Sequence, residues 1–141
     1  GEIQGHLSGY VHQLQLVNWQ PVSFDAYFGT PADNGLPRKI SQKAINNLSN
    51  LGGGGVVNVL SQGVLQFFEN FSYERLGWGC HLHNGICQMR GAEAAANGYY
   101  IVKGGGLPPR IDVIGYNQRV DWEELLNRLK RVSHIKAPQV K

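Results

Sequence analysis

The chain begins with alternating apolar and polar positions, a pattern that predicts paired β-strands. Within residues 1–28, apolar side chains recur at every second position, first up to Leu16 and again from Val22. The sequence Trp19-Gln20-Pro21 interrupts this alternation and predicts the break between two strands. The first strand is expected from Gly5 to Leu16. If the chain is a fragment cut from a longer sheet, the outer edge of this strand is expected to be unpaired and prone to pairing with another chain.

Three later segments change to helical spacing. Ser41 is typical of a helix N-cap and opens the first of them, which ends at a run of four glycines. The second is predicted from Val56 to Phe71, where apolar residues recur every three or four positions. The third begins at Asp121, with Glu124 three residues later completing a capping box.

Strand patterns return from Tyr73, and further strands are predicted at Tyr99 to Val102 and Arg110 to Gln118. Strands that follow one another in sequence pair most simply as hairpins. The fold class is therefore predicted to be α+β, with a single antiparallel, curved β-sheet and about three helices packed on one face. Residues 1–141 are expected to form a single domain.

The only two cysteines, Cys80 and Cys87, flank the dipeptide Asn84-Gly85. Asn-Gly is the strongest short signal for a tight hairpin, because both residues accept a positive φ. With a loop from Leu82 to Gly85, the two cysteines lie opposite each other on paired strands. This spacing predicts a cross-strand disulfide and an oxidising compartment.

Other interpretations of the same segment stay open. Two reduced, buried thiols in a cytosolic chain are one alternative. A zinc site formed by Cys80, His81, His83 and Cys87 is disfavoured, because successive strand residues point to opposite faces. A cysteine nucleophile activated by histidine meets the same objection, although a distant histidine could approach in space. We therefore assign no catalytic residue, metal ligand or cofactor.

Composition narrows the class of protein further. The chain has 141 residues, a net charge of +3 and 42% hydrophobic residues, with three Trp, six Tyr and five Phe. No basic stripe interleaved with aromatic residues is present, so we expect no nucleic acid as a partner. No run of 18 apolar residues predicts a membrane-spanning helix. Since the chain begins at Gly1, we expect a processed chain or a fragment of a longer protein.

A candidate hydrophobic surface lies on the second predicted helix and the strand after it. Phenylalanines dominate this helix face, and no charge cluster accompanies them. Packing against the sheet is the simpler interpretation, and a surface facing lipid is the alternative. The candidate residues for such a lipid-facing surface are Val64, Phe67, Phe68, Phe71, Leu76 and Trp78.

Several segments resemble successive stretches of one family. They are Asn18–Ala26, Arg38–Ala44, Gly63–Phe68, Cys80–Leu82 with Gly85–Met89, Tyr100–Gly104 and Arg119–Trp122. The chain resembles the C-terminal region of AsmA-like envelope proteins of Gram-negative bacteria, the TamB and YdbH relatives, which includes a region labelled dicarboxylate-transport-like. The resemblance extends from about Leu16 to Leu129.

The resemblance implies a long, curved β-sheet protein that is anchored in the inner membrane and crosses the periplasm. Its apolar groove is implicated in moving phospholipid towards the outer membrane. This chain would be a C-terminal fragment at the outer-membrane-proximal end, located in the periplasm. The family offers no catalytic residues to transfer.

Three functional hypotheses follow. The leading one is a non-enzymatic periplasmic module involved in phospholipid transport between the two membranes and in envelope integrity, with phospholipid and the rest of the parent chain's β-sheet as partners. The second is an assembly module that docks through its open sheet edge to an outer-membrane protein. The third is a small cysteine- or metal-dependent enzyme.

Overall fold

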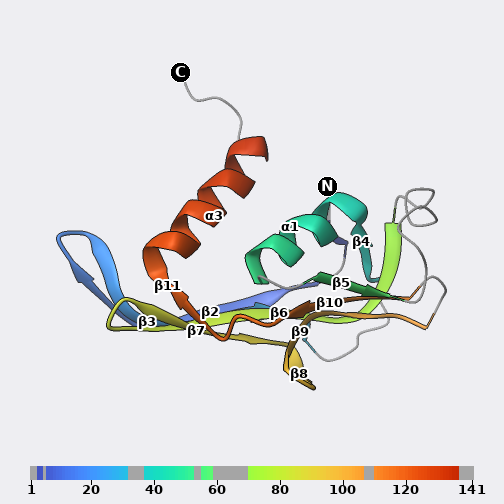
Figure 1. The fold of residues 1–141 in the computed structure, drawn as a ribbon, viewed down its shortest axis with the longest axis horizontal. Helices are drawn as coiled ribbons and strands as arrows, with labels where there is room; N and C mark the ends of the chain where they lie inside the picture. Colours follow the sequence, from blue (N-terminus) through green and yellow to red (C-terminus); the bar gives the residue numbers. More distant parts are fainter. Residues whose placement is uncertain are drawn as a thin grey trace.

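The computed structural model describes residues 3–4, 6–31, 37–52, 55–58, 70–106 and 110–136. Within these ranges the chain forms one antiparallel sheet of eleven strands and two helices. Both helices lie on the same face of the sheet (Figure 1). The predicted α+β class with an antiparallel sheet and helices on one face is therefore confirmed, with two helices in the described part where about three were predicted.

The long strand β6 (Asn70–His83) is the centre of the sheet. Its first half pairs with β4 (Lys39–Ser41) and β9 (Gly98–Gly104). Its second half pairs with β3 (Gln20–Gly29) and β7 (Ile86–Gly91). The sheet thus consists of two halves that share one strand, and the two helices lie over different halves.

The remaining strands extend these two halves. In the first half, β9 also pairs with β8 (Glu93–Ala95) and β10 (Ile111–Gly115), β10 pairs with β5 (Gly55–Asn58), and β4 pairs with β1 (Ile3–Gln4). In the second half, β7 pairs with β11 (Arg119–Asp121), and β3 pairs with β2 (Ser8–Val17). Among the described strands β2 pairs with β3 alone, as predicted for an open edge.

Helix α1 (Gln42–Gly52) covers the first half of the sheet and contacts β10, β5, β4 and β9. It begins where predicted, because the Ser41 Oγ accepts a hydrogen bond of 3.1 Å from the Ala44 backbone N–H. Its apolar side contributes Ile45 and Leu48 to the core. The most deeply buried side chains of the sheet are Ile40, Leu76, Leu82, Cys87, Ile101, Val102, Ile111 and Val113.

Helix α3 (Trp122–Lys136) follows directly from β11 and slants away from the sheet (Figure 1). The Asp121 Oδ2 accepts a hydrogen bond of 3.1 Å from the Glu124 N–H, which confirms the predicted cap. Leu125 is fully buried, whereas Trp122 and Leu129 are only partly buried against the core. The slant of α3 therefore leaves space between its apolar side and the sheet.

The second predicted helix, Val56 to Phe71, is wrong at both of its described ends. Val56 and Val57 belong to β5, where they pair with Val113 and Asp112 of β10. Phe71 belongs to β6 and pairs with Ile40. At the start of the segment, the apolar residues have helical spacing, but the backbone pairs with β10 and forms a strand. The β-branched valines there favour a strand. The rest of this segment lies outside the described residues.

The hairpin of β6 and β7 contains the predicted turn at Asn84-Gly85, with φ of 50° and 76°. The predicted register is wrong, because the loop has two residues and Cys87 pairs with Leu82. Cys80 is consequently the diagonal neighbour of Cys87 on the same face. The disulfide between them is confirmed, with a Cα–Cα distance of 5.4 Å. A diagonal pair reaches this distance within the range that disulfides span.

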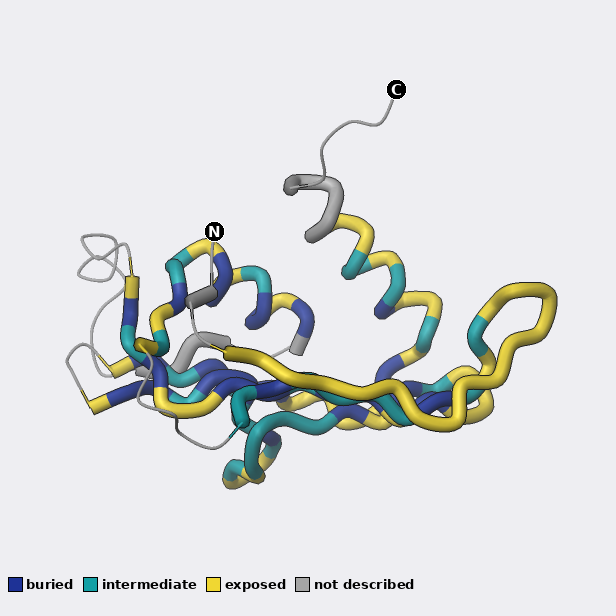
Figure 2. The backbone as a smooth tube through the Cα atoms, turned by 180° about the vertical axis from the view of Figure 1, so that it is seen from behind, coloured by how far each residue is buried: buried dark blue, intermediate teal, exposed yellow. Residues whose placement is uncertain are grey.

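The hairpin of β2 and β3 turns at Asn18-Trp19, with φ of 51° and 64°, which overlaps the predicted break at Trp19. A β-bulge at Gln13, whose φ is 54°, shifts the register between His12 and Gln15. All ten residues of β2 are exposed. Figure 2 shows this strand as a continuous exposed band along the sheet edge. The bulge divides β2 into a base beside the sheet and a distal part towards the turn.

Candidate functional site

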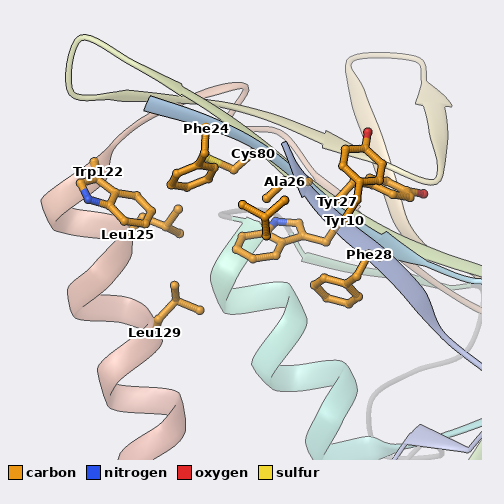
Figure 3. A pocket seen from close by; sticks show the side chains of 13 residues that line it. Tyr10, Phe24, Ala26, Tyr27, Phe28, Cys80, Trp122, Leu125 and Leu129 are labelled. Carbon is orange, nitrogen blue, oxygen red and sulfur yellow. The ribbon is translucent and has the colours of Figure 1, made fainter. Parts of the chain in front are cut away.

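An apolar groove opens between α3 and the second half of the sheet (Figure 3). Its floor is formed by Phe24, Ala26 and Phe28, which alternate along β3 and so share one face. Trp78 and Cys80 of β6 are the cross-strand partners of Phe28 and Ala26 and extend the floor. The Phe28 and Trp78 rings meet edge to face, with centroids 6.0 Å apart.

The wall of the groove is the apolar side of α3. Trp122, Leu125 and Leu129 follow helical spacing and point towards the sheet in Figure 3. The Trp122 and Phe24 rings lie edge to face at 5.3 Å, so they join wall and floor. Val11 of β2 lines the groove and is 60% exposed. The groove is therefore bounded by segments from the beginning, middle and end of the chain.

The groove has a volume of about 500 Å³, within the ~300–1,000 Å³ typical of small-molecule pockets. None of its lining residues, all of which are described, carries a formal charge. Tyr10 and Tyr27 are also among the lining residues, although Figure 3 shows their rings and hydroxyl groups on the other side of the sheet. The lining offers no nucleophile and no acid–base pair, so its chemistry suits hydrocarbon.

One polar group in the lining lacks a partner. The indole Nε1 of Trp78 is buried and has no hydrogen-bond partner among the described residues. A buried donor without an acceptor costs roughly 1–3 kcal/mol. The atom also has almost no solvent-accessible surface, so this N–H does not open into the groove.

The opposite face of the same strands is polar. The Arg90 Nη1 donates a hydrogen bond of 2.9 Å to the Asp25 Oδ1, and its Nη2 donates one of 2.7 Å to the Tyr10 hydroxyl. Its guanidinium also lies over the Tyr27 ring, 5.3 Å from the centroid. Partial burial lowers the pKa of Arg90, but the hydrogen bonds and electrostatic interactions with Asp25 and Tyr10 together outweigh it and raise the pKa. This cluster fastens the base of the β2–β3 hairpin to β7.

Two histidines flank this cluster. The His81 Nδ1 lies 3.8 Å from the Asp25 Oδ1, and the His12 ring stacks on Tyr10 with centroids 4.1 Å apart. Among the described residues, no group of three or more His, Cys, Asp or Glu side chains is arranged to hold a metal ion. The bonds that Asp25 makes to Arg90 give this carboxylate a structural role.

The predicted lipid-facing residues divide into three groups. Phe71 and Leu76 are buried in the core, with exposed fractions of 3% and 0%, and take no part in a surface. Trp78 lines the groove. Val64, Phe67 and Phe68 lie outside the described residues.

The groove itself was missed, although its parts are visible in the sequence. The alternation along β3 and the helical spacing of Trp122, Leu125 and Leu129 both predict apolar faces. No groove between those two faces was predicted. Nothing in the sequence shows that the two faces stand apart and leave a space.

Comparisons with known proteins do not decide the function. No protein-family model matches this chain, and neither a curated protein nor a solved structure does. None of the described helices is long and apolar enough to cross a membrane. The function is therefore argued from the groove and the surfaces around it.

Proposed function

We propose that this chain is a non-enzymatic lipid-handling module whose apolar groove shields an acyl chain of a phospholipid from water. The groove between α3 and the β3–β6 floor carries this proposal, because it is an open apolar space with no charged side chain in its lining. In line with the resemblance to AsmA-like proteins, the module serves phospholipid transport between the inner and outer membranes and supports envelope integrity.

The physical basis is the hydrophobic effect. Burying a methylene group contributes about 0.8 kcal/mol, so ten buried methylenes contribute roughly 8 kcal/mol before the entropy of ordering the chain is subtracted. Phe24, Phe28 and Leu129 offer rings and branched side chains to such a chain. Binding of this kind is non-directional, which suits a chain that has to slide in and out.

The buried disulfide between Cys80 and Cys87 is compatible with the oxidising periplasm. The proposed location is the periplasm, where this chain would form the outer-membrane-proximal end of a protein anchored in the inner membrane. A non-enzymatic role fits the groove, since its lining holds no acid, base or nucleophile.

Native mass spectrometry with phosphatidylethanolamine tests the proposal. Ala26→Phe fills the groove floor, and Ala94→Phe makes the same change on the exposed strand β8. We expect one lipid adduct on the wild-type protein and on Ala94→Phe, and at least a tenfold weaker signal for Ala26→Phe. An equal lipid signal from all three proteins would contradict a site in the groove.

A second candidate is an assembly module that docks through the edge of β2, with the parent chain's sheet or an outer-membrane protein as partner. The ten exposed residues of β2 favour it, because they include no Lys, Arg, Asp or Glu to protect the edge. Photocrosslinkers placed at Val11 and, as a control, at Ala94 test it in cells. Crosslinks to another strand from Val11 alone are expected, and none from Val11 would contradict edge docking.

A further inference from the structure

The distal part of the β2–β3 hairpin, Leu14 to Val22, exposes apolar side chains with little packing. This segment is called the hairpin tip below. Trp19 at the turn is 91% exposed, and Val17 beside it is 57% exposed. Leu14, Leu16 and Val22 are each at least 40% exposed. The tip lies at the end of the molecule where α3 begins, and it rises towards the helix side of the sheet (Figures 1 and 2).

Trp19 destabilises this turn. Its φ of 64° lies in the left-handed region, which costs a residue with a Cβ roughly 1–2 kcal/mol relative to right-handed backbone. A bulky residue there is uncommon, and glycine is the usual occupant of this position in a two-residue hairpin turn. Because the ring is almost fully exposed, packing within the chain does not offset the cost. A strained, exposed Trp points to a contact outside this chain.

The charge pattern indicates what that contact is. Between Glu2 and Asp25 the sequence contains no Lys, Arg, Asp or Glu. A charged protein surface would find no complementary group on the tip, whereas a lipid interface requires none. Trp is enriched where bilayers meet water, because its ring is apolar and its N–H stays hydrated.

We propose that the hairpin tip docks in the headgroup region of a phospholipid bilayer, with Trp19 as its principal anchor. The polar side chains of Asn18 and Gln20 suit this depth. Among the described strands β2 pairs with β3 alone, so the backbone groups on its outer edge would lack partners in the hydrocarbon core. The hairpin therefore lies in the interface and does not span the membrane.

The position of the tip connects this docking to the groove. A second hollow of about 580 Å³ lies between Val22 of the hairpin, Leu82 of β6 and Trp122 of α3. Trp122 also lines the groove, so the two spaces share one side chain. A docked tip would bring this end of the groove close to the bilayer. Delivery of an acyl chain along this route rests on the proposed lipid-handling function, whereas docking itself does not.

Flotation with phosphatidylcholine vesicles tests the docking. These vesicles carry no net charge, so the net charge of +3 does not drive binding. Trp19→Gly removes the anchor and gives the turn its preferred Asn-Gly sequence, so this variant should remain folded. Tyr116→Ser is the matched control, because Tyr116 is also an exposed aromatic residue and lies outside the hairpin.

We expect the wild-type protein and Tyr116→Ser to float with the vesicles, independently of salt. Trp19→Gly should partition roughly tenfold less, the factor that corresponds to about 1.4 kcal/mol of lost apolar burial. Wild-type protein that stays with the soluble fraction, or Trp19→Gly that floats equally well, would overturn the proposal.

The groove-filling variant separates this proposal from the proposed function. Ala26→Phe should float as well as wild type while losing the lipid adduct in native mass spectrometry. Loss of flotation with retained lipid binding in Trp19→Gly is the converse expectation. If Ala26→Phe failed to float, docking would depend on the groove and not on the tip, which would overturn the inference.

Discussion

Two hairpins of this protein have nearly the same turn and opposite surroundings. Asn84-Gly85 joins β6 to β7 with φ of 50° and 76°, and Asn18-Trp19 joins β2 to β3 with φ of 51° and 64°. The first hairpin is crosslinked by a disulfide and lies in the middle of the sheet. The second forms the edge, and all ten residues of β2 are exposed.

The two hairpins differ in how deeply their apolar side chains are buried. Leu82 and Cys87 of the β6–β7 hairpin are completely or almost completely buried. Seven of the nine exposed large apolar side chains in the described part belong to the β2–β3 hairpin, namely Tyr10, Val11, Leu14, Leu16, Val17, Trp19 and Val22. The β6–β7 hairpin thus contributes to the core, whereas the β2–β3 hairpin leaves most of its large apolar side chains exposed.

A matched pair of leucines tests this division most strongly. Leu82→Ala should lower the free energy of unfolding by about 2–5 kcal/mol, because Leu82 is 1% exposed and its loss leaves a cavity. Leu16→Ala should lower it by less than about 1 kcal/mol, because Leu16 is 44% exposed. Urea unfolding followed by circular dichroism measures both. Similar losses for the two variants would remove the distinction between the hairpins.

The disulfide is expected to have the next largest effect. Closing the loop from Cys80 to Cys87 restricts the unfolded chain and should stabilise the fold by about 2–3 kcal/mol. Denaturation with and without reductant measures this difference, and a Cys80→Ser/Cys87→Ser variant, which lacks the bridge, should not respond to reductant. Two titratable thiols in the protein isolated without reductant would show that the bridge does not form.

Alkaline pH should weaken the buried side of the sheet. Burial raises the pKa of Tyr99 from 10.0 to about 12, and the ring packs beside Gly91 at the end of β7. The unfolded state loses the Tyr99 proton first, so stability is fully present below pH 10 and is lost as pH rises towards 12. The slope is at most about 1.4 kcal/mol per pH unit. Burial also raises the pKa of Tyr73, so Tyr99→Phe should reduce the alkaline slope without abolishing it. An unchanged alkaline slope in that variant would contradict the contribution of Tyr99.

Exchanging turn residues should give the smallest effects, with opposite signs. Gly85→Ala should destabilise the β6–β7 hairpin by about 1 kcal/mol, because φ is 76° although the space around it is open. Trp19→Gly should stabilise the fold by a similar amount, because glycine relieves the strain at a φ of 64°. Thermal unfolding of the two variants measures both shifts. A destabilised Trp19→Gly would mean that the Trp19 ring packs within the chain.

The sequence predicted features that depend on local rules. The Asn84-Gly85 turn, the disulfide and the caps at Ser41 and Asp121 are all confirmed, because each depends on residues within a few positions of one another. The register of the same hairpin was wrong, since a cysteine pair can close directly across two strands or diagonally.

Features that depend on distant segments were harder to predict. Helical spacing at Val56 and Val57 did not reveal that β10 would pair with them. The turn at Asn18-Trp19 lacks the glycine that usually marks such a turn. The groove depends on the slant of α3 relative to β3, and no pattern within either segment specifies that slant.

Photolabelling with a phospholipid that carries a diazirine at the end of an acyl chain tests the central claim most directly. Vesicles containing this lipid would be mixed with the wild-type protein and with Ala26→Phe, irradiated, and the labelled peptides identified. We expect label in the wild type on peptides that contain Phe24 to Phe28 or Trp122 to Leu129, and its loss in Ala26→Phe. Label spread over exposed strands such as β8, or unchanged in Ala26→Phe, would contradict a groove that holds an acyl chain.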